Sequence, residues 1–219
     1  MTEQDARQSI VDACRSMNAL GINQGTSGNI SVRLADRMLI SPSAIPYEEM
    51  RPEQIATMDV TDETGAWVGP WPPSTEWRFH LGILRARPDA GAVVHAHPTF
   101  CTALAIARRG IPACHYMIAT FGGDDVRCAD YATYGTLELA DRALQALEGR
   151  NACLLANHGM IVCGPTLKRA MWLAVELETV ARQYWYSLLI GGPVLLDDAQ
   201  IAETAAKLAG YGVESAAIP

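Results

Sequence analysis

Lysine and histidine are scarce in this sequence, and their scarcity limits the chemistry that it can support. Only Lys168 and Lys207 occur among 219 residues, together with five histidines. Both lysines lie in charge-rich helical patterns, whereas a Schiff-base mechanism needs a desolvated lysine. The sequence therefore argues against catalysis through a covalent lysine adduct.

Basic runs, long apolar runs and paired cysteines are also lacking. The net charge is −7 with no basic run, which argues against nucleic acid as a partner. No apolar stretch has the length of a membrane span, and the first residues do not resemble a signal peptide. The six cysteines form no C-x-x-C pair and mostly lie in apolar segments, as reduced core residues do. We therefore expect a cytoplasmic protein that binds neither nucleic acid nor membrane.

The composition predicts one folded domain over residues 1–219, because 49% of the residues are apolar and can form a sizeable core. Residues 61–73, rich in Gly, Pro and Asp, are expected to form a loop. The intermixed order of helices and strands predicts an α/β or α+β fold around a mixed sheet. Helical patterns cover 3–20, 75–86, 99–109, 136–148, 166–190 and 197–209, and strand patterns cover 30–34, 38–41, 54–60, 92–98, 112–120, 152–156 and 160–163.

The apolar run AVVHAHP (92–98) carries two histidines at strand spacing. Residues two apart in a strand face the same side, so His95 and His97 present two imidazoles next to each other. Such a pair suits a tetrahedral divalent metal such as zinc, although two ligands do not complete a site. The alternative is that both are ordinary polar residues on a half-exposed strand face.

Two further residues could supply the metal ligands that the histidine pair lacks. Glu76 lies in the first turn of a predicted helix, and His158 lies at a turn between two apolar runs. With His95 and His97 they would complete a site of three histidines and a carboxylate. Glu76 also shares a helix face with His80 at i, i+4, so a second pairing stays open.

Three small-residue stretches are candidates for an anion site. QGTSGN (24–29) and SPSAIP (41–46) allow backbone amides to approach a ligand, and Ser74 with Thr75 would begin a helix, where anions are favoured. The first stretch lacks the spacing of nucleotide-binding loops and also fits a tight structural turn. Ser74 also fits the role of a simple N-cap.

Seven stretches in this order resemble the class II aldolases of the L-fuculose-1-phosphate aldolase type, within the aldolase/adducin group. The resemblance spans nearly the whole chain and implies a single α/β domain with a mixed, largely antiparallel sheet flanked by helices. The stretches are NQGTSGN (23–29), IPYE (45–48), STEWRFH (74–80), AVVHAH (92–97), HYMIA (115–119), YATYGT (131–136) and NHG (157–159).

The resemblance implies one Zn²⁺ per subunit, held by His95, His97 and His158, with Glu76 as a fourth ligand or nearby base. It also implies a homotetramer with active sites at the interfaces, in which Tyr116 reaches the site of a neighbouring subunit. The substrate implied is a ketose 1-phosphate, cleaved to dihydroxyacetone phosphate and an aldehyde. The implied phosphate-binding residues are Thr26, Gly28, Asn29, Ser43, Ala44, Ser74 and Thr75.

Some positions differ from the pattern of the fuculose enzymes. Ala44 stands where glycine is frequent, and it can replace glycine if its φ stays negative. Tyr134 and Asn157 replace other residues on the expected aldehyde side, and Tyr211 matches a tyrosine that caps the substrate there. These differences leave the sugar open between L-fuculose 1-phosphate and a 5-deoxy- or 5-methylthioribulose 1-phosphate.

Other members of the same group give the competing hypotheses. A pentulose-phosphate 4-epimerase shares the three histidines, and a sugar-acid phosphate decarboxylase shares the fold but needs a group to hold its substrate's carboxylate. A binding domain like that of adducin would have lost the metal histidines, which this sequence keeps. A structural zinc is normally closed by Cys and His ligands, which does not match this set.

Overall fold

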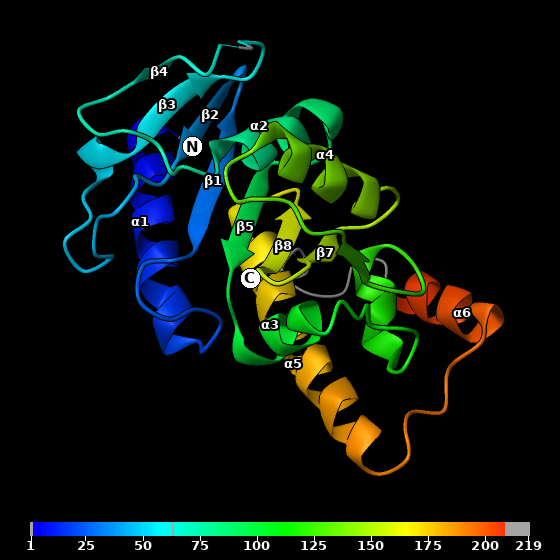
Figure 1. Cartoon of the computed structure of the whole chain (residues 1–219). Helices are drawn as coiled ribbons and strands as arrows, with labels where there is room; N and C mark the ends of the chain where they lie inside the picture. The colour runs from blue at the N-terminus through cyan, green and yellow to red at the C-terminus, as the bar shows by residue number, and fades with distance from the viewer. Residues whose placement is uncertain (1, 63, 209–219) are drawn as a thin grey trace, which may run out of the picture.

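One eight-stranded sheet organises the protein in the computed structural model, which describes residues 2–62 and 64–208 (Figure 1). The strand order is β4-β3-β2-β1-β5-β8-β7-β6, and every neighbouring pair is antiparallel except β6 and β7. This confirms the expected mixed, largely antiparallel sheet. The strands are β1 (Asn29–Leu34), β2 (Arg37–Ile40), β3 (Ala56–Asp59), β4 (Trp67–Val68), β5 (Ala92–Ala96), β6 (Arg127–Ala129), β7 (Ala152–Leu155) and β8 (Gly159–Gly164).

Helices cover both faces of the sheet and give three layers. Helices α1, α3 and α5 pack on one face, and α2 and α4 pack together on the other (Figure 1). The helices are α1 (Glu3–Ala19), α2 (Trp77–Ala86), α3 (Thr99–Ile106), α4 (Leu137–Ala146), α5 (Leu167–Leu189) and α6 (Asp198–Leu208), with 3₁₀ turns η1 (Pro52–Gln54) and η2 (Tyr116–Phe121). None of the helices within the described ranges combines the length and apolar character of a membrane span.

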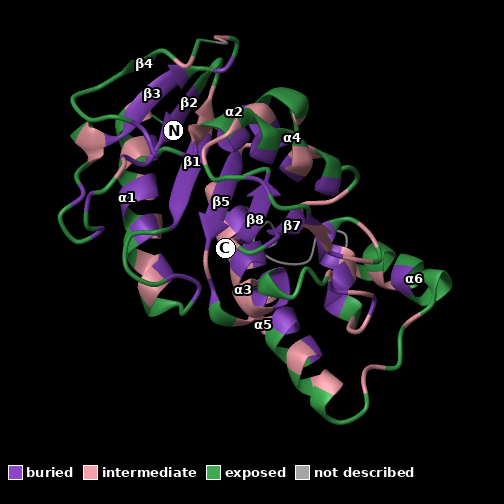
Figure 2. Cartoon of the chain, in the orientation of Figure 1, coloured by how far each residue is buried: buried purple, intermediate pink, exposed green. Residues whose placement is uncertain are grey.

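Alternation along the strands divides the core into two halves. In β5, Val94 packs toward α1 and α5, whereas Val93 packs toward α2 and α4. Both faces of the sheet are buried, as Figure 2 shows, so central strands read as continuous apolar runs. His95 lies two residues after Val93 in the same strand, so its side chain is on the same face of the sheet and points toward α2.

The segment 112–120 was expected to be a strand, and this expectation was wrong. Residues Tyr116–Phe121 form the 3₁₀ turn η2 instead. His115 caps it, because its Nδ1 accepts the backbone N–H of Met117 at 3.2 Å, and Gly122 ends it at φ 96°. Helix α6 packs against η2, so this apolar run is buried by a helix rather than by pairing with other strands.

Three smaller differences concern element boundaries. The expected loop 61–73 contains the short edge strand β4, and β6 had no sequence signal. Helix α2 begins at Trp77 rather than at 75, so Ser74 lies before the N-cap position, which is Glu76. Ser74 still stabilises this turn, since its Oγ accepts the backbone N–H of Glu76 at 3.3 Å.

Candidate active site

The pairing of β1 with β5 places polar side chains beneath α2. Asn29 lies opposite His95, and Ser31 lies opposite Val93. Directly opposed residues in an antiparallel pair share a face, so Asn29, Ser31 and His95 all point toward α2. Helix α2 contributes Glu76 at its N-cap and His80 one turn later.

His97 and His158 join this group from two loops that meet at the end of the sheet. His97 directly follows β5, and His158 lies in the tight connection between β7 and β8. Asn157 takes a φ of 56° there, and a Cβ on Gly159 would lie 2.5 Å from the His97 ring. A glycine after His158 is therefore required for the two imidazoles to come together.

The three histidines form a compact donor set. One ring nitrogen from each of His95, His97 and His158 lies within 4.8 Å of the others. Nε2 of His95 is 2.9 Å from Nε2 of His97 and 3.1 Å from Oε2 of Glu76, while Nε2 of His158 is 3.3 Å from Oε1 of Glu76. His80, the other histidine considered at the sequence level, is outside this set.

The hydrogen bond on the far side of His95 fixes its tautomer. Nδ1 of His95 lies 2.8 Å from the carbonyl oxygen of Met160, which only accepts, so Nδ1 carries the proton and donates. In this tautomer Nε2 is an acceptor that faces a carboxylate oxygen of Glu76 at 3.1 Å, and the two acceptors repel each other unless a proton or a cation lies between them. A divalent metal fits this donor set, because it removes the repulsion and takes neutral imidazole nitrogen and carboxylate oxygen.

Burial keeps the loop histidines neutral. Desolvation is the main cause, and it lowers the pKa of His97 to about 3 and that of His158 to about 4. Burial also lowers the pKa of His80 to about 3. At neutral pH each of these rings therefore offers a lone pair rather than a second proton.

Glu76 is buried but ionised. Burial alone would raise the pKa of its carboxyl, but His95, His158 and the Asn29 amide together lower that pKa well below its usual value. Oε2 accepts a hydrogen bond from Nδ2 of Asn29 at 2.9 Å. Oε1 is buried and has no hydrogen-bond partner among the described residues. A buried acceptor without a donor is costly and points to a missing ligand or proton.

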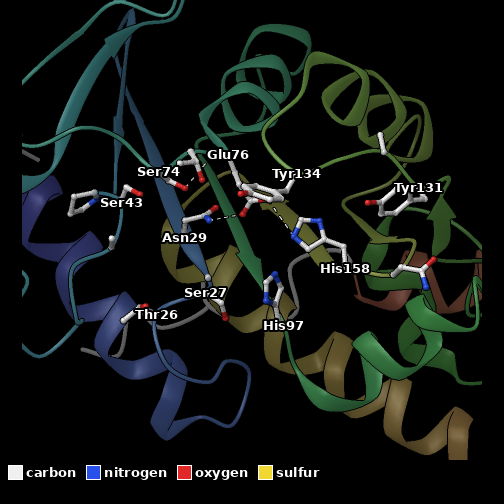
Figure 3. A pocket seen from close by; sticks show the side chains of 16 residues that line it. Thr26, Ser27, Asn29, Ser43, Ser74, Glu76, His97, Tyr131, Tyr134 and His158 are labelled. Carbon is white, nitrogen blue, oxygen red and sulfur yellow. Dashed lines mark hydrogen bonds and ion pairs between the residues drawn. The ribbon is translucent and has the colours of Figure 1, made fainter.

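A cavity of about 420 Å³ opens beside these groups, a size that suits a small-molecule ligand. In Figure 3, Thr26, Ser43 and Ser74 stand at one side of it, Tyr131 at the other, and His97, His158 and Glu76 between them. The polar wall includes all seven residues expected at the phosphate: Thr26, Gly28, Asn29, Ser43, Ala44, Ser74 and Thr75.

At two of these seven positions the backbone geometry restricts which residue type can fit. A Cβ on Gly28 would lie 2.8 Å from the carbonyl oxygen of His95, so this glycine permits close packing of the loop against β5. Ala44 has a φ of 59°, so the condition under which alanine could replace glycine without strain, a negative φ, is not met. The turn needs the left-handed conformation that explains why glycine is frequent there, and alanine occupies it under strain.

The expected aldehyde-side residues are placed differently from one another. Tyr134 lines the cavity and is 65% exposed. Tyr116 lies on η2, is 51% exposed and is not among the residues that line the cavity of this single chain. Tyr211 lies outside the described residues.

Sequence reasoning missed several residues that line the cavity. Tyr131 and Ala132 lie just before Tyr134, and Ser27 lies within the first small-residue turn. Asn157, which the sequence placed on the aldehyde side only as a difference from related enzymes, does line the cavity beside His158. Its signal was available, since asparagine before His-Gly favours a left-handed turn.

Comparison with known proteins places the chain in a family. The profile of the family described as Class II Aldolase and Adducin N-terminal domain matches residues 8–185. The chain is 50% identical over 213 residues to a 5-methylthioribulose-1-phosphate/5-deoxyribulose-1-phosphate aldolase of Rhodospirillum rubrum, covering 97% of this chain and 95% of that one. It is 48% identical over 211 residues to the L-fuculose phosphate aldolase of Escherichia coli K12, covering 95% of each.

A solved structure agrees with these relatives. An L-fuculose 1-phosphate aldolase superposes with a TM-score of 0.90 at 40% sequence identity, covering 94% of this chain and 96% of that one. The chain therefore belongs to the class II aldolase and adducin family, and it is a class II aldolase of the fuculose-phosphate type, a lyase that works with a divalent metal.

Proposed function

We propose that this aldolase reversibly cleaves a ketose 1-phosphate between C3 and C4, giving dihydroxyacetone phosphate and an aldehyde. The observation that supports it most is one cavity that joins a cluster of three histidines and a carboxylate to a wall of hydroxyls and backbone amides. A phosphorylated sugar presents an anion and a carbonyl a few atoms apart, and this cavity offers a group for each.

The metal of this proposal is zinc, one per subunit, held by His95, His97 and His158. Imidazole ligands in a compact set suit zinc, and the site stays open on the cavity side, as catalytic zinc sites do. When bound, the metal supplies Lewis acidity that lowers the energy of negative charge on the ketone side of the substrate.

Glu76 is the base that handles the proton on C3. In condensation it removes this proton, and in cleavage it returns one to C3 after the C3–C4 bond has broken. Glu76 lines the cavity, and its Oε1 atom lies 3.3 Å from Nε2 of His158 and has no hydrogen-bond partner among the described residues, which leaves this oxygen to take the proton. Glu76→Gln should keep the fold and lose C3 proton exchange.

Tyr116 is proposed to act on the aldehyde oxygen from a neighbouring subunit of a homotetramer. In cleavage it accepts the proton of the C4 hydroxyl as the C3–C4 electron pair stays with the dihydroxyacetone half, and in condensation it donates that proton back. Its half-exposed position on η2, outside the cavity of its own chain, suits a residue that serves another subunit. Tyr116→Phe should slow cleavage while sparing C3 proton exchange.

The phosphate is proposed to bind at the wall formed by the turns 26–29 and 43–44 and by the start of α2. Ser43, Ser74 and Thr75 offer hydroxyls, and the N-terminus of α2 adds the positive end of its helix dipole. With a net charge of −7, the chain depends on such local groups to hold a dianion.

Two sugars are candidates for the aldehyde half. L-fuculose 1-phosphate is supported by the Escherichia coli relative and the solved structure. A 5-methylthio- or 5-deoxyribulose 1-phosphate is supported by the Rhodospirillum rubrum relative and by Tyr131 and Tyr134, whose aromatic faces suit a thioether or a methyl group.

The deciding experiment measures release of dihydroxyacetone phosphate from L-fuculose 1-phosphate and from 5-methylthioribulose 1-phosphate, with and without a chelator. We expect chelator-sensitive release, and the larger kcat/KM identifies the sugar. A metal-loaded protein that releases nothing from either compound would contradict the proposal. Recovery of an epimerised pentulose phosphate in place of triose phosphate would indicate a 4-epimerase instead.

A further inference from the structure

A chain of hydrogen bonds runs from β1 through α2 to the catalytic carboxylate. Oγ of Ser31 lies 2.8 Å from Nδ1 of His80, and Nε2 of His80 lies 2.5 Å from Oδ1 of Asn29. Nδ2 of Asn29 then donates to Oε2 of Glu76 at 2.9 Å. Ser31 and His80 are fully buried, and Asn29 is 5% exposed.

The carboxylate fixes the direction of every bond in this chain. An ionised Glu76 only accepts, so the Asn29 amide must turn its NH₂ group toward it and its oxygen toward His80. That oxygen only accepts, so Nε2 of His80 must carry a proton and donate. Nδ1 of the neutral ring is then an acceptor, and the Ser31 hydroxyl donates to it.

We propose that His80 is a positioning residue, which acts through Asn29 to hold Oε2 of Glu76 and so leaves Oε1 as the oxygen that exchanges a proton with the substrate. Oε1 is the carboxylate oxygen without a hydrogen-bond partner among the described residues. His80 does not contact the cavity, and it is outside the group that can hold a metal. Its place on α2, four residues after Glu76, therefore serves orientation rather than ligation.

This inference also changes the expected role of Asn29. Its side-chain oxygen accepts from His80 while its nitrogen donates to Glu76, so both ends of the amide are used inside the protein. A carboxylate held at one oxygen has lost rotational freedom before the substrate arrives. Removal of residues that orient a catalytic group from behind typically lowers activity by about 10- to 100-fold.

The first test is independent of activity and of the proposed function. Selective ¹⁵N labelling of histidine and NMR at pH 7 report which ring nitrogen of His80 carries the proton. We expect a neutral His80 protonated at Nε2, with Nδ1 unprotonated, and loss of this signal pattern in His80→Gln identifies the residue. A His80 protonated at Nδ1, or at both nitrogens, would overturn the inference.

The second test rests on the proposed function and measures exchange of the C3 proton of dihydroxyacetone phosphate with solvent. In metal-loaded His80→Phe we expect about a 10- to 100-fold slower exchange, unchanged metal content and little change in KM. His80→Gln keeps an N–H near the position of Nε2 and should recover most of the rate. Ser31→Ala, which leaves the ring in place, should reduce the rate less than His80→Phe.

The matched control is Leu84→Ala, a buried core substitution one turn after His80 in the same helix, whose apolar side chain makes no hydrogen bond to Asn29. It should lower the melting temperature and leave the exchange rate unchanged, so a loss of rate in His80→Phe is not a consequence of lower stability alone. Equal rates in His80→Gln and His80→Phe would contradict the positioning role. A wild-type enzyme without exchange or cleavage would contradict the proposed function, and the NMR measurement would still decide the direction of the hydrogen bonds.

Discussion

At the scale of single residues, Ala44 combines a position on the cavity wall with a strained conformation. Its φ of 59° is costly for any side chain with a Cβ, and Ala44 lines the cavity. We expect Ala44→Gly to raise the free energy of unfolding by about 1 kcal/mol, because relief of strain exceeds the added freedom of the unfolded chain. Urea denaturation monitored by circular dichroism measures this.

The chain offers a matched control for this prediction. Ala35 has a φ of 53° in the turn between β1 and β2, outside the cavity. Ala35→Gly should stabilise the protein by a similar amount without any change in KM. If Ala44→Gly destabilised the protein, the left-handed conformation assigned to Ala44 would be wrong.

The metal can be tested at the same scale. His95→Ala should remove bound metal and most activity, because His95 contributes the Nε2 that lies nearest to both His97 and Glu76. Elemental analysis of purified protein measures the metal directly. His115→Asn is the control, since His115 caps η2 outside the cluster and should retain metal at the wild-type level. Full metal content in His95→Ala would exclude the proposed site.

At the scale of elements, the start of α3 depends on a residue from another helix. Pro98 occupies the N-cap position of α3 and provides no side-chain hydrogen bond. Glu178 of α5 supplies the missing cap. Its carboxylate accepts the backbone N–H groups of Phe100 and of Cys101, each at 2.9 Å. This contact fixes the turn that directly follows His97.

We therefore expect Glu178→Ala to lower the free energy of unfolding by about 1–2 kcal/mol, since two N–H groups of the first turn lose their acceptor. Urea denaturation measures the loss, and hydrogen exchange should show faster exchange at Phe100 and Cys101. Glu176→Ala, in the same helix but without this capping contact, is the control. An equal loss in both variants would argue against the capping role.

At the scale of the whole molecule, the proposed homotetramer predicts that two inactive proteins can restore each other. If Tyr116 serves a neighbouring site, mixed oligomers of Glu76→Gln and Tyr116→Phe contain some sites with both native residues. Random mixing in equal amounts should return about a quarter of wild-type cleavage activity. Co-refolding followed by the triose phosphate assay measures this, with each variant refolded alone as the control. Activity no higher than the two variants alone would indicate that Tyr116 acts within its own chain.

The sequence determined most of the elements and the residues that we propose for the site. Alternation in the run 92–98 put His95 and His97 on one side, because the two-residue period of a strand is a local property. The periodic patterns also predicted most helices and the hairpin of β1 and β2. Local signals were insufficient at 112–120, where packing against α6 turned an apolar run into a 3₁₀ turn.

Only the tertiary structure decided how these side chains work together. His80 could have been a ligand by its spacing from Glu76, but the pairing of Asn29 opposite His95 places an amide between the two, so His80 binds Asn29 instead. The positive φ of Ala44 and the cap that Glu178 provides for α3 likewise could not be predicted from neighbouring residues in the sequence. The physical reason is that residue type and period are set within a few positions of the chain, whereas strand register and helix packing join residues such as Asn29, Glu76 and His158 from far apart in it.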